Sequence, residues 1–148
     1  MNDISIAIVD REKTSISLEK AEIFVRDATH GAVTFFLGIV RNHNLKKKVI
    51  AVTYDVFEAH AVKSFKLIAL EAQKRIGKNK LKIFVQHAKG KLRVSDTSVI
   101  VAVGSAHRNE SIKACEYIIN EIKKRSPIWK MEHYKTGDGQ WLQGKPLI

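Results

Sequence analysis

Cysteine is almost absent from this sequence: Cys115 is the single thiol in 148 residues, so no disulfide can form within the chain. A secreted domain held together by disulfides is therefore excluded, and a lone thiol is typical of a reducing compartment. No apolar run approaches the roughly 20 residues that cross a membrane as a helix. The opening stretch MNDISIAIVDREK has no basic start and no sustained apolar region, so we expect no secretory signal. The sequence predicts a cytoplasmic protein.

Linkers and low-complexity segments are also missing, because no stretch rich in proline, glycine or serine interrupts the chain. The hydrophobic content of 45% and the charged content of 28% are ordinary for a globular protein. A chain of this length can bury a core of its own. We therefore expect residues 1–148 to form a single domain.

Negative charge is scarce: 15 Asp and Glu oppose 26 Lys and Arg, which leaves a net charge of +11. Such an excess indicates an anionic partner, whether a nucleic acid, a phosphorylated metabolite or an acidic protein. The alternative is a lysine-rich surface that reflects the charge habits of a genome rather than a binding site. Which of the two holds depends on which cations lie in a site.

The spacing of the apolar residues predicts strands and helices along the whole chain. We expect strands at residues 4–9, 31–40, 49–57, 80–90, 97–105 and 128–134, and helices at 17–27, 58–77 and 108–125. This order predicts one α+β or α/β domain with mixed pairing of its strands.

Three local features refine this prediction. Ser17 stands where it can cap the first helix, and Gly38 inside an apolar strand indicates a bulge or a close backbone approach. We also expect the strand at 49–57 to pair with the strand at 31–40.

Two lysines are predicted to meet after the last helix. The apolar stripe of that helix consists of residues three and four apart: Ile112, Cys115, Ile118, Ile119 and Ile122. Lys123 lies at the rim of this stripe, whereas Lys124 lies opposite it and should be solvated. Pro127 must end the helix and turn the chain. Lys130 can then return beside Lys123 on the strand that follows.

Neighbouring ammonium groups at a partly apolar rim lower each other's pKa, through desolvation and through repulsion between like charges. A neutral lysine is a nucleophile or a general base, and a charged lysine binds an oxyanion. The alternative is that Lys123 only extends along apolar surface to reach water and that Lys130 is solvated.

Two further stretches place cations at the ends of predicted elements. In GSAHRNES, His107 and Arg108 lie where a strand ends and a helix begins, and free backbone N–H groups at such a place attract phosphate. In GIVRNHN, Arg41 directly follows a buried strand, which fixes its position. The alternatives are a helix cap with a surface arginine and a charged loop.

Several common site motifs are missing. The histidines form no H-x-x-x-H pair and the lone cysteine excludes a thiolate cluster, so we expect no zinc site. There is no Walker loop, no G-x-G-x-x-G and no nucleophile elbow around a serine. A small nucleic-acid-binding domain is the rival hypothesis because of the charge. The strands, however, carry no aromatic pair of the kind that stacks on RNA, and no helix-turn-helix spacing is present.

Three stretches together resemble one protein family. GAVTFFLGIVRNHN, GSAHR and KKRSPIWK, in this order and spacing, resemble the catalytic (large) subunits of molybdopterin synthase over roughly residues 30–142. The combination of V-R-N-H-N, A-H-R and K-x-R-x-P-x-W-K is very specific to that family.

The resemblance implies an α+β fold of the α/β hammerhead type, with a mixed, largely antiparallel sheet and two long helices. It also implies a homodimer that binds one small ubiquitin-like subunit at each end, giving a heterotetramer. The C-terminal Gly-Gly of that partner carries a thiocarboxylate and enters a pocket of the large subunit. The implied enzyme is a sulfurtransferase, which converts cyclic pyranopterin monophosphate into the dithiolene of molybdopterin for molybdenum cofactor biosynthesis. No metal or other cofactor is implied for this step.

The resemblance also assigns residues. It gives catalytic roles to Lys123 and Lys130, and Phe36 matches an aromatic residue near the site. The substrate-binding residues that it implies are Ile39, Val40, Arg41, His107, Arg108, Lys123, Lys130, Met131 and Glu132. Lys145, four residues after Trp141, takes the place of a basic residue that comes from the neighbouring subunit, where arginine is usual. Lysine keeps the charge there but loses the bidentate geometry of arginine.

Overall fold

The structure is a computed structural model that describes residues 3–77, 80–135 and 140–141. In chain order its elements are β1 (Ile4–Asp10), α1 (Leu18–Val25), β2 (Ala32–Ile39), β3 (His43–Asn44), β4 (Lys47–Val56), α2 (Glu58–Arg75), β5 (Lys82–Arg93), β6 (Thr97–Ser105), α3 (Arg108–Arg125), β7 (Ile128–Tyr134) and β8 (Gln140–Trp141). The fold is α+β, as predicted. No helix within these ranges is long and apolar enough to cross a membrane.

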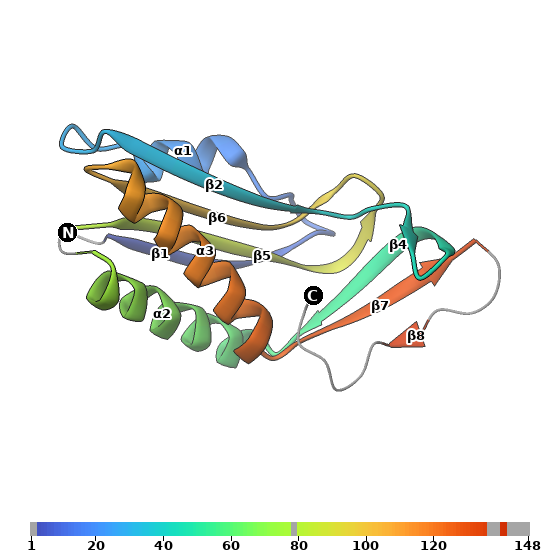
Figure 1. The fold of residues 1–148 in the computed structure, drawn as a ribbon. Coiled ribbons are helices and arrows are strands. Elements are labelled where there is room, and N and C mark those ends of the chain that lie inside the picture. The colour runs from blue at the N-terminus through green and yellow to red at the C-terminus, as the bar shows by residue number, and fades with distance from the viewer. Residues whose placement is uncertain (1–2, 78–79, 136–139, 142–148) are drawn as a thin grey trace.

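The strands join in one sheet with the order β2-β6-β5-β4-β7-β8, in which β1 lies beside β5 and β3 beside β4. All the pairings are antiparallel except that of β1 with β5. The helix α1 covers one face of the sheet, and the two long helices α2 and α3 cover the other face (Figure 1). The mixed, largely antiparallel sheet with two long helices is therefore confirmed.

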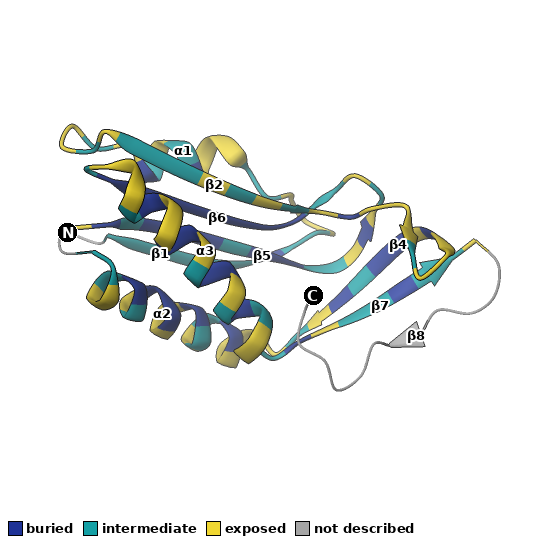
Figure 2. Cartoon of the chain, in the orientation of Figure 1, coloured by how far each residue is buried: buried dark blue, intermediate teal, exposed yellow. Residues whose placement is uncertain are grey.

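Both faces of the central strands are buried, and each face has its own core. Between the sheet and the long helices the core includes Phe65, Ile68, Val85, Val101, Ile118 and Ile122. On the opposite face, Ala21 and Val25 of α1 pack with Phe84, Ile100 and Ala102. Burial on both faces explains why β6 is a continuous apolar run rather than an alternating one. Figure 2 shows the long helices buried toward the sheet and exposed on their outer sides.

The strand β5 connects the layered body to an outer arm. Its first half pairs with β1 and β6, and its second half pairs with β4. Gly90 lies at the start of that second half with φ at +94°, a conformation that glycine adopts without strain. Beyond this point β4 and β7 extend from the helical body as a long antiparallel pair (Figure 1).

The chain reversal at Pro127 takes the predicted form. The helix α3 ends at Arg125, and the backbone N–H of Ser126 donates to the carbonyl of Ile122 at 3.2 Å. Its buried apolar residues are Ala114, Cys115, Ile118, Ile119 and Ile122. Ile112, which we predicted in this stripe, is 51% exposed. The buried side of the helix is therefore centred slightly further round than the apolar spacing indicates, because the small residues Ser111 and Ala114 face the sheet.

Local predictions have mixed outcomes. The hydroxyl of Ser17 accepts a hydrogen bond from the N–H of Lys20 at 3.2 Å, which confirms the helix cap. Gly38 lies at a register shift and so close to the side chain of Val99 that a Cβ would not fit, as its place in the strand indicated. The pairing of β4 with β2 was wrong: β4 pairs with β3, β5 and β7, because β6 occupies the side of β2 that pairs.

Cys115 is sealed in the core beneath β6. Its Sγ donates to the carbonyl of Val101 at 3.6 Å, and burial raises the pKa of the thiol to about 12. The thiol is therefore protonated throughout the physiological range.

Candidate active site

A cavity of about 420 Å³ opens where the end of β2, the middle of β4 and the last turn of α3 meet β7. Three cations line it: Arg41, Lys123 and Lys130. Each comes from a different part of the chain, so the cavity exists only because the sheet brings these parts together. Ile39, Val40 and Phe36 line the same cavity, as predicted.

The two lysines meet in the way that the sequence predicted. Lys123 lies half-buried in the last turn of α3, and Lys130 lies on β7 with 21% of its side chain exposed. Burial lowers the pKa of Lys123, and the positive charge of Lys130 lowers it further. Lys124, the neighbour that we expected in solvent, has a side chain that is 70% exposed. Lys123 therefore lies at the edge of the buried face of α3, as predicted.

A buried carboxylate accompanies Lys130. Oε2 of Glu132 lies 3.8 Å from Nζ of Lys130, and only 4% of the Glu132 side chain is exposed. Its other oxygen, Oε1, accepts hydrogen bonds from Nδ2 of Asn44 at 2.8 Å and from the hydroxyl of Tyr134 at 3.1 Å. The carboxylate therefore supports one of the two amines but leaves the cavity with a net positive charge.

Met131, which we predicted as a substrate-binding residue, is not among the side chains that line the cavity. Successive residues of a strand point to opposite faces of the sheet. Lys130 and Glu132 point into the cavity, so Met131 points away from it. Any contact that Met131 makes with a ligand there must come from its backbone.

Sequence reasoning missed three polar residues of the cavity, His87, Tyr54 and Ser98. His87 is 1% exposed, and its Nδ1 lies 2.7 Å from the carbonyl oxygen of Ala88. Burial, above all, lowers the pKa of His87 to about 4, so the ring is neutral and donates from Nδ1. Burial also raises the pKa of Tyr54. The rings of Tyr54 and His87 pack edge to face, with their centroids 4.9 Å apart. His87 continues the alternation of Ile83 and Val85 toward the helices, and this spacing was the signal that could have revealed it.

His107 and Arg108 lie elsewhere in the chain. They are exposed at the first turn of α3, while Lys123 lies in its last turn. Fifteen residues of helix separate Arg108 from Lys123, which is about 22 Å along the axis. A single copy of the chain therefore does not bring these two residues to the lysines. Lys145 lies outside the described residues.

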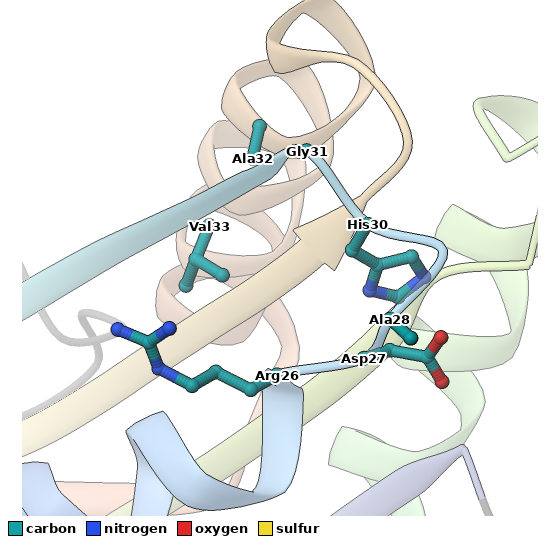
Figure 3. Close-up of a pocket in the computed structure, with 7 residues that line it drawn as sticks. All are labelled: Arg26, Asp27, Ala28, His30, Gly31, Ala32 and Val33. Carbon is teal, nitrogen blue, oxygen red and sulfur yellow. The ribbon is translucent and has the colours of Figure 1, made fainter.

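A second cavity, of about 530 Å³, lies at the other end of the sheet between α1 and β2 (Figure 3). Its polar side chains already have partners. Nδ1 and Nε2 of His30 face the carbonyl oxygens of Val25 and Lys80, and Asp27 pairs with Lys82 at 3.5 Å. In Figure 3 Arg26 points away from His30, and it pairs with Glu22. Among the residues that the structure describes, the charged and histidine side chains of this cavity all pair with neighbours, so the lysine cavity is the better candidate site.

The lysine cavity can bind an anion and move protons in the same place. Arginine holds phosphate or carboxylate with two parallel hydrogen bonds, and a lysine whose pKa is lowered gives up its proton more readily than a free lysine. Within the described ranges, no three His, Cys, Asp or Glu side chains converge as metal ligands. The fold and the site thus define an α+β protein with a cationic cavity that suits an anionic ligand.

Comparison with known proteins agrees with this class. Residues 11–125 match the family described as MoaE protein. The chain is 41% identical over 132 residues to the molybdopterin synthase catalytic subunit of Synechococcus elongatus, covering 89% of this chain and 79% of that relative. The chain belongs to the MoaE family, the enzyme family of the molybdopterin synthase catalytic subunits.

Solved structures show the same fold. Molybdopterin synthase from Staphylococcus aureus is 30% identical and superposes with a TM-score of 0.83, covering 95% of this chain and 97% of that one. A chain from the complex of subunits 1 and 2 of the molybdopterin-converting factor from Helicobacter pylori 26695 has a TM-score of 0.73 at 19% identity, covering 99% of this chain and 94% of that one. The resemblance inferred from the sequence motifs is confirmed.

Proposed function

We propose that this chain is a sulfurtransferase that converts cyclic pyranopterin monophosphate into molybdopterin. The sulfur comes from the C-terminal thiocarboxylate of a small ubiquitin-like partner. The observation that carries the proposal is the convergence of Lys123, Lys130 and Arg41 in one cavity of a MoaE-family chain. The whole of residues 1–148 acts as one domain in the cytoplasm, without a resident metal or cofactor.

The cavity provides a role for each cation. Arg41 binds the phosphate of the substrate and fixes its orientation. The thiocarboxylate sulfur displaces an oxygen from a carbon of the pterin, water then adds to the acyl carbon, and the C–S bond of the tail breaks to leave sulfur on the pterin and a carboxylate on the tail. Positive charge at a fixed distance stabilises the oxyanion that develops on the acyl oxygen when water adds. Lys130 supplies this stabilisation and exchanges protons, and Lys123 positions the substrate and tunes the proton affinity of its neighbour.

The partner enters as an extended tail. The structure from Helicobacter pylori is of a complex between two subunits of the converting factor, which supports a two-subunit assembly for this fold. An extended peptide that ends in two glycines is narrow enough to enter a cavity of about 420 Å³. The charge of +11 favours an acidic partner, because opposite charges speed association.

We further propose that the chain acts as a homodimer within a heterotetramer. His107 and Arg108 lie too far from the lysines of their own chain to share a ligand with them. A second copy can bring its own His107 and Arg108 to the cavity, and Lys145 is proposed to come from the neighbouring copy in the same way. The anion is then held by groups from two chains.

The direct test replaces one cation of the cavity at a time. Lys130→Ala should fold and dimerise but lose on the order of 100- to 10,000-fold in the rate of dithiolene formation, as expected when an acid–base group is removed. Arg41→Ala should instead raise KM for the precursor by about 10- to 100-fold, because it removes charge-assisted hydrogen bonds. The assay mixes the purified chain, the precursor and the thiocarboxylated partner.

Lys124→Ala is the matched control, since this exposed lysine of the same helix turn pairs only with Glu121 among the residues the structure describes. It should retain full activity. Wild-type activity in Lys130→Ala, or equal losses in both lysine variants, would remove Lys130 from the mechanism.

A further inference from the structure

A chain of hydrogen bonds through Asn44 connects Arg41 and Glu132, two residues that line the lysine cavity. Nη2 of Arg41 donates to Oδ1 of Asn44 at 3.3 Å, and Nδ2 of Asn44 donates to Oε1 of Glu132 at 2.8 Å. A guanidinium can only donate and a carboxylate can only accept, so these two neighbours fix the orientation of the amide. Asn44 thus connects the anion-binding arginine to the carboxylate that supports Lys130.

The carboxylate of Glu132 depends on this amide. Its Oε1 accepts from both Asn44 and Tyr134, which leaves Oε2 to face Nζ of Lys130 at 3.8 Å. Because the side chain is buried, a lost donor cannot be replaced freely by water. Without the Asn44 amide, only Tyr134 among the described residues donates to Oε1, and the carboxylate can turn and approach Nζ of Lys130 more closely than 3.8 Å, which shifts the amine.

The backbone holds Asn44 in place. It is the last residue of β3, and it pairs with Lys47 across a two-residue turn. The strand β4, which begins at Lys47, is paired along its length with β7, the strand that carries Lys130 and Glu132 (Figure 1). The hairpin therefore delivers the amide to the carboxylate through continuous strand pairing.

We propose that Asn44 is a positioning residue of the active site, which sets Arg41 through its amide oxygen and Glu132, and thereby Lys130, through its amide nitrogen. This inference rests on the proposed sulfur-transfer function. Replacement of an amide by a group that only donates or only accepts would satisfy one side and lose the other. Asparagine is suited to the position because it does both without adding charge to a cationic cavity.

Two double-mutant cycles separate the two arms. Asn44→Ala should lower kcat and raise KM for the precursor, each by about 5- to 50-fold, the range of coupling between groups in one hydrogen-bond network. In a Glu132→Gln background the effect of Asn44→Ala on kcat should vanish while the effect on KM persists. In an Arg41→Ala background the effect on KM should vanish while the effect on kcat persists. A purely structural role of Asn44 would give the same loss in every background, and that result overturns the proposal.

A second measurement does not depend on activity. Side-chain NMR signals of labelled Arg41 and Lys130 in the full-length chain should both move in Asn44→Ala. They should stay in place in Asn42→Ala, a matched control from the same segment whose side chain bonds His43 instead. Unchanged signals in Asn44→Ala reject the positioning role.

If the NMR signals move in Asn44→Ala but the wild-type chain makes no dithiolene, the sulfur-transfer function is rejected. The positioning role of Asn44 still holds in that case. If Asn44→Ala does not fold, Asn44→Ser replaces it, since serine keeps a polar group too short to reach both partners.

Discussion

His87 shows how burial sets the chemistry of a single side chain. The ring packs against those of Tyr54 and Phe65 and has almost no contact with solvent. Desolvation and the nearby charge of Lys123 lower its pKa from an ordinary 6.5 to about 4. The ring therefore adds no charge to the cavity and leaves the positive charge to the arginine and the lysines.

This pKa predicts a specific dependence of stability on pH. On acidification the unfolded chain binds a proton at His87 before the folded chain does, so stability is complete above pH about 6.5 and falls as the pH approaches about 4. Between pH about 7 and about 5 the free energy of unfolding should fall by about 2 kcal/mol on account of this residue. Urea denaturation at both pH values measures the change.

In His87→Gln, which does not titrate, this part of the pH dependence should disappear even if the variant is less stable overall. Asp27 and Glu71, whose pKa values are lowered to about 2, act only at more acidic pH and do not obscure the comparison. The same loss of stability in the variant would show that His87 is not its source.

Sequence reasoning placed site residues correctly where the geometry of a single helix and the turn after it decides their position. The periodicity of α3 and the stop at Pro127 were enough to bring Lys123 and Lys130 together. The link from Asn44 to Glu132 joins residues 88 positions apart, and it depends on which strands pair. No spacing along the chain encodes that pairing.

Among the elements, the β3–β4 hairpin is the one that its own sequence does not predict. Leu45 and Lys46 form a two-residue turn with φ at +49° and +65°, the conformation of a tight hairpin turn that favours asparagine and glycine. The segment NLKK carries no glycine, and we expected no strand between residues 41 and 48. Paired strands on either side hold the turn in a conformation that these side chains disfavour.

A substitution that relieves the strain of this turn should therefore stabilise the protein. Lys46→Gly should raise the free energy of unfolding by about 0.5 to 1 kcal/mol, because glycine adopts a positive φ without strain. Lys48→Gly, the same replacement two residues later in β4, should lower it by a similar amount, since glycine weakens a strand. Urea denaturation of both variants and the wild type gives the comparison. A loss of stability in Lys46→Gly would mean that the turn is not strained.

The remaining elements follow from pattern where the pattern is strong. The bounds of β6, α3 and β7 agree with those expected from the sequence. The error lay in pairing: we placed β4 beside β2 because they are consecutive, whereas β6 comes between them in the sheet together with β5. Strand order is a property of the whole sheet, and local propensity does not contain it.

At the scale of the whole molecule, the two groups of cations lie at opposite ends of α3. One copy presents Lys123 and Lys130 at one end, and it presents His107 and Arg108 at the other. In the proposed homodimer each complete site then takes its lysines from one chain and its second anion-binding group from the other.

Mixed dimers test this arrangement. At a precursor concentration well below the wild-type KM, Lys130→Ala, which removes the acid–base group, and Arg108→Ala, which weakens substrate binding, should each be nearly inactive alone. After unfolding and refolding together, the mixture should regain about a quarter of wild-type activity, because half of the dimers are mixed and each of those has one intact site. No recovery in a mixture shown to contain mixed dimers would place both residues in the site of a single chain.

The sealed thiol beneath β6 has a consequence for the route of the sulfur. Cys115 is the one residue of this chain that could accept sulfur as a persulfide, and it is protonated and enclosed in the core. Cys115 therefore cannot carry sulfur as a persulfide. For the same reason it cannot form a mixed disulfide with reactive groups that enter the cavity. In the proposed reaction the sulfur therefore passes from the thiocarboxylate tail to the substrate without a covalent bond to the enzyme.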